Sequence, residues 1–452
     1  MLEQFLEKYP HVKHVELVLI DPNGVARGKW APVSTLKKAF GEGVNFPLSL
    51  HGLDVWGNEV EETGLHISSG DLDGFCVAVP HTLVPLTSAS GSNLNPEEAR
   101  EAQVILKTLT PQHEPFWGCS RTVLENVVSR LAHQDLTAVC AFELEFHLVQ
   151  PNDGGAEAFR PAEHGEAPDA QLMYDLDALA EKAPVIADIR KGAEWADLPI
   201  DTIVKEAGPG QYEINLNHRS DALRAADDVV LLKRIVREAA RRHGMIATFM
   251  AKPFMEQPGN GMHVHTSLLD GEGANVFSES DGDNRLRHAV AGCLASLQEM
   301  ALVFINTKNG FRRMAAGSYA PTRVNWGSNN RSVAVRLPAA PDAAKRLEHR
   351  VSGADANPYL VLATILQGMF DGLSKAEMPQ AELTGNAYDA ETPNRGDSLP
   401  ADMTQALELF TTSQFAKTVM GSDMCAAFSA IKQAEIDRFA ADMSSFERRT
   451  YI

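Results

Sequence analysis

The most constraining feature of this sequence is a strand-like alternation in which one face is apolar and the other carries carboxylates. In Val139–Leu148 the apolar positions are Cys140, Phe142, Leu144, Phe146 and Leu148, and the opposite positions include Glu143, Glu145 and His147. Successive side chains of a strand point to opposite faces. The segment therefore predicts a strand with one face in the core and two glutamates on the other. Taken alone, the pattern is also typical of a strand with a solvated outer face.

The same alternation recurs in three further segments. Their polar faces carry Gln211, Glu213, Asn215 and Asn217 in residues 208–217, His263, His265 and Ser267 in residues 261–268, and Arg346, Glu348 and Arg350 in residues 345–351. Glu206 precedes Glu213 across a Gly-Pro-Gly turn. A solvated face favours lysine, serine and threonine, whereas these faces favour glutamate, histidine and arginine. We therefore expect these strands to converge on one polar, charged cavity.

The acidic residues of these faces indicate a divalent cation. Five glutamates and one histidine form an oxygen-rich set, which favours Mg²⁺ or Mn²⁺ over structural zinc. In proteins, Mg²⁺ commonly joins carboxylates to the phosphates of a substrate. The set is Glu143, Glu145, Glu206, Glu213, His263 and Glu348.

A basic segment supplies partners for the phosphates. Residues 312–350 contain eight basic residues and two acidic ones, in a chain whose net charge is −19. Arginine forks suit bidentate recognition of phosphate and carboxylate. Ion pairing with acidic helices is the alternative explanation. The basic residues are Arg312, Arg313, Arg323, Arg331, Arg336, Lys345, Arg346 and Arg350.

Composition excludes several classes of protein. Sixty acidic residues against 41 basic ones argue against non-specific nucleic-acid binding, which needs a basic footprint. The five cysteines are far apart and form no C-x-x-C pair, so we expect a reducing compartment. The first eight residues include Glu3 and Glu7 where a signal peptide needs basic residues. The most apolar window, residues 288–305, contains Gln298 and Glu299, which argues against a membrane span. We therefore expect a soluble, cytoplasmic protein without membrane or nucleic-acid partners.

The order of segments predicts two domains. Residues 11 to 80 are typical of short strands, residues 88–96 of a linker, and Asn95-Pro96 of a helix start. From Ser120 onward, helices and strands alternate. Helices are expected at Arg121–His133, at Leu223–Arg242 with Asp221 as cap, from Asn357 through Met369, and at Ala427–Met443.

In combination these motifs resemble the glutamine synthetase family, from about His11 to Tyr451. They are Phe142–Phe146, Glu206–Glu213, Lys252–Phe254, Gly259–His265, Asn330–Pro338, Arg346–Arg350 and Asn357–Leu360. The resemblance implies an α+β fold, with an N-terminal β-grasp domain over residues 11–110 and a catalytic domain over residues 118–452. In that domain a curved antiparallel sheet lines a funnel that admits ATP at one end and glutamate at the other.

The resemblance also implies a role for each matched residue. Glu145, Glu206 and Glu213 match ligands of a metal near glutamate, and Glu143, His263 and Glu348 match ligands of a metal near ATP. His265, Ser267, Arg336 and Arg346 match ATP contacts, and Gly259, Arg313, Arg331 and Arg350 match positions that hold glutamate or the transferred phosphate. Family members use two or three divalent ions and make γ-glutamyl phosphate, from which an amine displaces phosphate.

The chain departs from the family at the positions that bind ammonium. The ammonium-binding Asp is matched by Pro47 in Phe46–Leu50, and the flap Glu, six residues after Arg313, is matched by Tyr319. The glutamate-binding Asn is matched by Pro258, with Asn260 two residues later. Loss of both acceptor-side carboxylates favours a larger amine. The resemblance gives Arg313, Arg331 and Tyr319 catalytic roles.

The pattern is most similar to the subgroup of γ-glutamylpolyamine synthetases, through Asn45–Ser49, Trp326–Arg331 and Gly353–Tyr359. The resemblance implies ATP-dependent ligation of the γ-carboxylate of glutamate to putrescine or another polyamine, in polyamine catabolism. Ethanolamine and aromatic amines stay open as acceptors. The alternatives are an ammonia-using glutamine synthetase and a catalytically inactive structural homologue. The family forms homododecamers of two hexameric rings. Tyr388 falls where some bacterial members are nucleotidylated, but its flanking residues differ, so we expect no modification.

Overall fold

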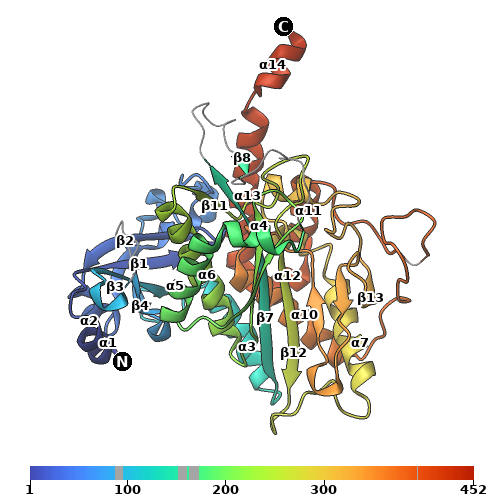
Figure 1. Cartoon of the computed structure of the whole chain (residues 1–452), viewed down its shortest axis with the longest axis horizontal. Helices are drawn as coiled ribbons and strands as arrows, with labels where there is room; N and C mark the ends of the chain where they lie inside the picture. Colours follow the sequence, from blue (N-terminus) through green and yellow to red (C-terminus); the bar gives the residue numbers. More distant parts are fainter. Residues whose placement is uncertain (87–94, 151–159, 162–172, 394) are drawn as a thin grey trace.

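The computed structural model describes residues 1–86, 95–150, 160–161, 173–393 and 395–452, which form two sheets with surrounding helices. The first sheet, blue in Figure 1, lies at one side of the molecule. The second sheet occupies the centre, and its strands β7 and β12 are the long arrows there. The chain is therefore an α+β protein, as predicted.

The first sheet has the strand order β2-β1-β6-β4-β3, with β5 paired to β6. Strand β1 runs antiparallel to β2 and parallel to β6. Its strands are β1 (His14–Ile20), β2 (Ala26–Pro32), β3 (Val44–Pro47), β4 (Asp73–Ala78), β5 (Val84–Leu86) and β6 (Glu101–Leu109), with α1 (Leu2–Lys8) and α2 (Thr35–Ala39) beside them. The turn predicted at residues 21–24 joins β1 to β2, where the Gly24 N–H donates to the Asp21 carbonyl over 2.9 Å.

Two predictions about the segment before β6 are wrong. The helix expected from Asn95 is only a 3₁₀ turn at Pro96–Glu98, followed by strand β6. The Asn95 side chain does cap that turn, but pairing of the following residues with both β1 and β4 overrides the local helix signal. Because β5 and β6 belong to one sheet, residues 88–96 do not separate two domains. Residues 88–94 themselves lie outside the described residues. The domain limits 11–110 and 118–452 stay predictions.

The second sheet has the strand order β13-β14-β15-β12-β7-β10-β9, with β8 and β11 also paired to β7. Strand β7 pairs antiparallel with both β10 and β12. Its strands are β7 (Thr137–Gln150), β8 (Arg160–Pro161), β9 (Ile200–Lys205), β10 (Gln211–Leu216), β11 (Ile246–Thr248), β12 (Met262–Leu269), β13 (Trp326–Ser328), β14 (Val335–Leu337) and β15 (Leu347–His349). All four polar-faced segments thus lie in this sheet.

The predicted helices of the larger part of the chain are confirmed as α3, α6, α10 and α13. The caps Asp221 and Asn357 accept hydrogen bonds from the first turns of α6 and α10. Helix α10 continues to Lys375, beyond its predicted end. No described helix is long and apolar enough to cross a bilayer. The helices are α3 (Ser120–Ala132), α4 (Leu176–Glu181), α5 (Ala183–Trp195), α6 (Ala222–Arg242), α7 (Gly282–Ala295), α8 (Ala301–Phe304), α9 (Lys308–Arg313), α10 (Pro358–Lys375), α11 (Met403–Thr412), α12 (Gln414–Met420), α13 (Ser422–Ala441) and α14 (Ser445–Tyr451).

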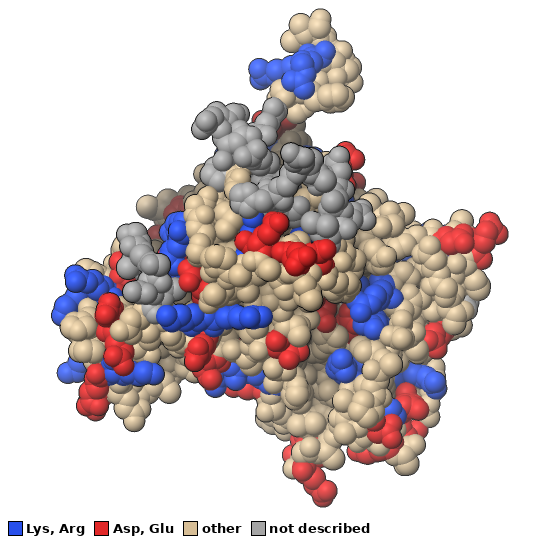
Figure 2. Space-filling model, viewed as in Figure 1, with Lys and Arg blue, Asp and Glu red and all other residues tan. Residues whose placement is uncertain are grey.

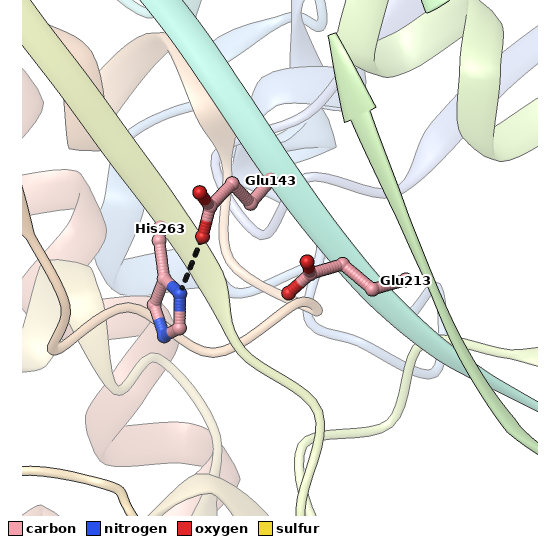
Figure 3. Close-up of side chains that lie close together, drawn as sticks. All are labelled: Glu143, Glu213 and His263. Carbon is pink, nitrogen blue, oxygen red and sulfur yellow. Dashed lines mark hydrogen bonds and ion pairs between the residues drawn. The ribbon is translucent and has the colours of Figure 1, made fainter. Parts of the chain in front are cut away.

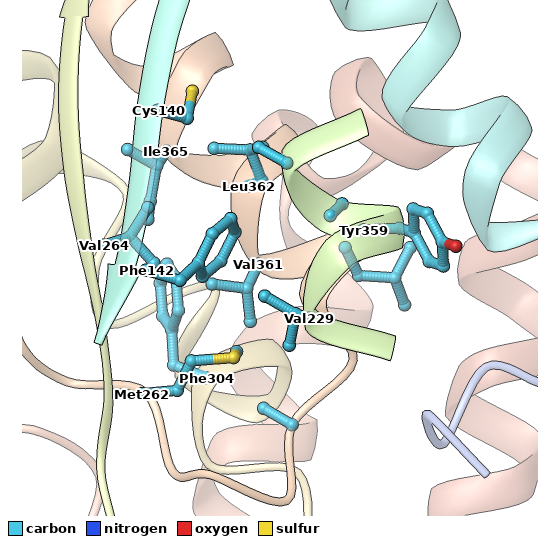
Figure 4. Packing of buried hydrophobic residues seen from close by; sticks show 14 of the residues in the cluster. Cys140, Phe142, Val229, Met262, Val264, Phe304, Tyr359, Val361, Leu362 and Ile365 are labelled. Atoms are coloured by element: carbon cyan, nitrogen blue, oxygen red, sulfur yellow. The ribbon is translucent and has the colours of Figure 1, made fainter. Parts of the chain in front are cut away.

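The apolar face of the second sheet packs on helices and forms the main core (Figure 4). Phe142 of β7 and Val264 of β12 lie against Val361 and Leu362 of α10, and all four are buried. This packing confirms the predicted apolar face of the strands. Because helices cover that face, the glutamates and histidines are left on the other face of the same strands.

A buried lysine ties the end of the chain to its beginning. The Lys432 ammonium on α13 is 0% exposed and donates to Glu435, to the carbonyl of Asn306 and to the side chain of Asn23. The other oxygen of Glu435 accepts from the backbone N–H of Val55, over 3.1 Å. The C-terminal helix α13 is thereby anchored to the first sheet, whereas α14 projects from the molecule (Figure 1).

Candidate active site

Strand register brings the predicted metal ligands together. Glu143 of β7 stands opposite His263 of β12, and Glu145 of β7 stands opposite Glu213 of β10. On the next strand, Glu348 of β15 stands opposite His265. In Figure 3, Glu213 and His263 approach Glu143 from the two strands that flank β7. One continuous ladder therefore positions six chemically active side chains.

Both histidines contact the same carboxylate. Glu143 is 3.0 Å from Nδ1 of His263 and 2.7 Å from Nε2 of His265. Arg346 donates to Nδ1 of His265 over 3.2 Å, so this nitrogen is the acceptor and Nε2 carries the proton given to Glu143. Glu143 thus links the predicted metal ligands to two residues matched to ATP contacts.

Two sets of ligand atoms lie within 4.8 Å of one another, namely Glu143 with Glu213 and His263, and Glu143 with His265 and Glu348. Glu145 lies beside them and accepts from the Gly261 N–H over 2.6 Å. Carboxylate oxygens with one imidazole fit a hard divalent cation. The assignment of each residue to one of two metals stays a prediction, because the sets share Glu143.

Burial and mutual repulsion raise the pKa values of two carboxylates in the cluster, Glu213 and Glu206. Burial, followed by the neighbouring Glu145, Glu143 and Glu206, raises the pKa of Glu213 to about 9. Burial and then Glu145 raise the pKa of Glu206 to about 7. Burial alone would raise the pKa of Glu143, but the hydrogen bonds from His263 and His265 outweigh it and hold that pKa well below its usual range. A divalent cation would relieve this repulsion, so the donor set fits one.

Mg²⁺ or Mn²⁺ is therefore expected to stabilise the protein. A cation that binds only the folded state at 100 times its Kd adds about 2.7 kcal/mol to the free energy of unfolding. Calorimetric unfolding in EDTA and then in excess MgCl₂ measures the rise in Tm. KCl of equal ionic strength is the control, and an equal rise with KCl would contradict a specific site.

Arginines surround Glu348 on the cluster's other side. Arg336 donates to Glu348 over 2.7 Å, and Arg350 also donates to it. Both Nε atoms are buried without a partner among the described residues. Burial raises the pKa of Glu348, but Arg350 and the two histidines together hold it below its usual range. These guanidinium groups therefore keep donors available beside the carboxylates.

Arg313 lies behind the cluster and is held by the backbone. It donates to the Val351 carbonyl over 2.8 Å and to the Arg350 carbonyl over 3.4 Å. A Cβ at Gly261 would lie 2.7 Å from Arg313 Nη2, and one at Gly259 would lie 2.4 Å from the Ala251 carbonyl oxygen. Glycine at these two positions thus leaves room for the Ala251 backbone and for the Arg313 guanidinium.

A cavity of about 900 Å³ adjoins the cluster. Glu143, His265, Ser267 and Arg346 line one part of it, so three of the four residues matched to ATP contacts face the same space. Arg336 is not among its lining residues. Nucleotide-sized ligands need pockets of this order, since ligand sites span about 300–1,000 Å³.

Several residues around the site were missed by sequence reasoning. Asn215, Arg219 and Arg224 line the cavity. Asn215 was recognised only as a polar strand position, whereas Arg219 and Arg224 follow the strand and carry no periodic signal. Asn260 is fully buried, and its side chain contacts His147 at 2.8 Å and the Met250 carbonyl at 2.9 Å.

The predicted acceptor residues do not meet within one chain. Tyr319 lies between α9 and β13, is 64% exposed and has a left-handed φ of 59°. Pro47 ends β3, which lies far from β7 and β12 in Figure 1. Arg331 is exposed and acts electrostatically on Glu206. Tyr174 belongs to no predicted motif. Its pKa is raised chiefly by burial, and it interacts electrostatically with both Glu206 and Arg331.

On the face seen in Figure 2, basic side chains are scattered among acidic ones and form no single stripe. Among the described residues visible there, this is unlike the basic footprint that nucleic-acid binding requires. Small-molecule chemistry in the cavity is consistent with such a surface.

Comparison with known proteins agrees with the geometry. Residues 117–451 match the glutamine synthetase catalytic domain. The chain is 37% identical to the γ-glutamylputrescine synthetase PuuA of Escherichia coli (strain K12), over 97% of this chain and 91% of the relative. It is 29% identical to a glutamate–isopropylamine ligase of a Pseudomonas species, over 100% of this chain and 97% of the relative. The solved structure of a GmaS/ADP complex superposes with a TM-score of 0.84 at 28% identity, over 100% of this chain and 98% of the solved chain. With its fold, its site and its sequence in agreement, this chain belongs to the glutamine synthetase family.

Proposed function

We propose that this protein is an ATP-dependent ligase that joins the γ-carboxylate of glutamate to a primary amine of putrescine or another polyamine. The observation that carries the proposal is a cluster of glutamates and histidines that could hold a divalent cation, in a chain that lacks a carboxylate at positions 47 and 319. Relatives named for ligation of glutamate to putrescine and to isopropylamine support an amine acceptor.

We assign the carboxylate cluster and the arginines to phosphoryl transfer. Bound Mg²⁺ or Mn²⁺, two or three per site, would neutralise charge on ATP and on the transferred phosphoryl group. The ions would be held by Glu143, Glu145, Glu206, Glu213, His263 and Glu348. ATP would contact His265, Ser267, Arg336 and Arg346, while Gly259, Arg313, Arg331 and Arg350 would hold glutamate and the phosphoryl group.

The proposed reaction has two displacements. A γ-carboxylate oxygen attacks the γ-phosphorus of ATP, the bond to ADP breaks, and γ-glutamyl phosphate forms. The amine nitrogen then attacks the acyl carbon, phosphate leaves with the bonding electrons, and the nitrogen loses a proton. In this proposal the arginines stabilise charge on the transferred phosphoryl oxygens in both steps.

The acceptor site is proposed to lie between two copies of the chain. Strand β3, which ends at Pro47, lies far from β7 and β12 in one copy, so the two parts meet only if the first sheet of a neighbour covers the cluster. We propose a ring-shaped assembly, a dodecamer of two hexameric rings, working in the cytoplasm. Tyr319 then offers a phenol to the incoming nitrogen where ammonia-using members have a carboxylate.

Diamines are expected to exceed ammonia in kcat/KM by at least about 100-fold, which is about 2.7 kcal/mol of differential transition-state binding. A polyamine brings a second ammonium and a carbon chain that can be bound, whereas ammonia brings neither. Phosphate release would be measured with glutamate, ATP and matched concentrations of ammonium, putrescine, ethanolamine and an aromatic amine.

The variant Tyr319→Glu is the matched test of the acceptor position. Restoring a carboxylate should narrow the gap between putrescine and ammonium, without making a good glutamine synthetase, because Pro47 is unchanged. If ammonium is the best acceptor of the wild type, the protein is an ordinary glutamine synthetase. If no amine supports metal-dependent ATP turnover, it is an inactive homologue.

A further inference from the structure

Tyr388 is joined to the loop that carries Tyr319. Its hydroxyl donates to the backbone carbonyl of Ala320 over 2.9 Å, across 68 positions of sequence. Ala320 directly follows Tyr319, whose left-handed φ of 59° is unfavourable for a residue with a side chain. The hydrogen bond therefore fixes the loop at the position where its backbone is under strain.

The backbone around Tyr388 is itself held by the two residues that flank Arg331, in the connection between β13 and β14. The Ala387 N–H donates to Ser332 Oγ over 3.0 Å, and Asn330 donates to the Gly385 carbonyl over 2.8 Å. Ala387 is buried in a small cluster with Val333 and Leu383. The segment 385–388 is thus attached on both sides of Arg331, and Tyr388 extends from it to the Tyr319 loop.

The Tyr388 ring also lies near two more arginines of the site. Burial raises the pKa of Tyr388 to about 12. The charges of Arg350 and Arg313 act to lower this pKa, and Tyr319 acts to raise it. The phenol stays protonated at neutral pH, so it is a permanent donor to Ala320. Tyr388 therefore lies between the Tyr319 loop and the three arginines that we assign to glutamate and phosphate, namely Arg313, Arg331 and Arg350.

A second tether holds the same loop. Ser318 Oγ contacts the carbonyls of Arg313 and Ala315, at 3.0 and 2.6 Å. The rest of the loop faces solvent, since Ala315, Ala316, Gly317 and Tyr319 are exposed. Two side-chain hydroxyl groups, of Tyr388 and Ser318, thus hold the loop on either side of Tyr319.

We propose that Tyr388 is a positioning residue that holds the Tyr319 loop over the acyl phosphate and so favours attack by amine over attack by water. The inference rests on the proposed function. In the competing reaction, a water oxygen attacks the acyl carbon, phosphate leaves with the bonding electrons, and a proton passes to solvent. Glutamate is regenerated, and one ATP is consumed without product. A closed loop suppresses this loss by excluding water.

The test is the ratio of amide formed to phosphate released. With saturating putrescine, the wild type is expected to give one amide per phosphate. Tyr388→Phe removes only the donor, and it should lower that ratio to about one half or less and raise glutamate-dependent phosphate release without amine about fivefold. Ser318→Ala, which removes the other tether, should act in the same direction. Tyr451→Phe, on the projecting helix α14, is the matched control.

The outcomes separate this inference from the proposed function. If the wild type and Tyr388→Phe both form one amide per phosphate released, the positioning role is overturned, even if the variant is slower. A lower ratio in Tyr388→Phe, with a Tm within about a degree of the wild type, supports it. A wild type that releases phosphate but forms no amide from any amine overturns the proposed function and this inference together.

Discussion

Glu213→Gln is expected to lower turnover by about 100- to 1,000-fold while making the metal-free protein more stable. The substitution keeps the shape of the side chain but removes one of the carboxylates that face Glu143 and His263. Loss of a single pre-organised charge contact at a reacting centre commonly costs this much in rate. It also removes a buried charge, since burial and then repulsion from the neighbouring carboxylates raise the pKa of Glu213 to about 9 in the folded protein.

The stabilisation should depend on pH in a defined direction. Below the ordinary glutamate pKa of 4.5, Glu213 is protonated in both the folded and the unfolded state, so the variant and the wild type should differ little. Between about 4.5 and 9 only the unfolded state loses the Glu213 proton readily, so this residue makes the wild type lose stability as pH rises, and the variant lacks that contribution. The difference in Tm in EDTA should therefore grow from pH 5 to pH 9.

Glu272→Gln, at an exposed turn after β12, is the control for the loss of one negative charge. It should change neither the rate nor the pH dependence of the Tm. Mg²⁺ should raise the Tm of Glu272→Gln as it does that of the wild type, and it should raise that of Glu213→Gln much less. Near-normal turnover in Glu213→Gln would contradict the metal assignment.

Lys432→Met is expected to destabilise the protein by about 3–5 kcal/mol, the usual cost of removing one partner of a buried ion pair. Glu435 is 1% exposed and would keep its charge without the ammonium that now contacts it at 3.0 Å. The Asn23 side chain and the Asn306 carbonyl would lose their donor as well. Urea unfolding followed by tryptophan fluorescence measures the effect.

The adjacent Gln433→Met is the matched control, because Gln433 bonds only at the surface of the same helix. It should change the free energy of unfolding by less than about 0.5 kcal/mol. The double variant Lys432→Met, Glu435→Leu should recover part of the loss, since no charge is left buried. Equal midpoints for Lys432→Met and Gln433→Met would show that this network adds nothing to stability.

Periodicity carried most of the information about the second sheet. The alternation around Phe142 and Val264 identified the buried face, and the opposite face then followed from geometry alone. Helix ends were equally visible where a cap is a local hydrogen bond, as at Asp221 and Asn357. Such signals are readable because both the cause and the effect lie within a few residues.

Features that depend on distant partners were not predictable. Asn95 does cap a short 3₁₀ turn, but the residues after it form strand β6 because they pair with β1 and β4. The sharing of Glu143 between two histidines depends on the facing strand, and Tyr388 reaches Ala320 across 68 positions of sequence. Sequence periodicity gives the face on which a residue lies, whereas its partner depends on tertiary packing.

The central position of β7 in the second sheet limits where the amine specificity of such enzymes can change. Its pairing with β10 and β12 sets the positions of Glu143, Glu145, Glu213 and His263 together. A one-residue insertion or deletion within β7 would turn its glutamates into the core, so length changes there are not tolerated. Tyr319 lies in a loop and Pro47 at a strand end, where substitutions leave this register intact. New amine specificities can thus arise by point substitution at such positions, while the inherited phosphoryl chemistry is passed on unchanged.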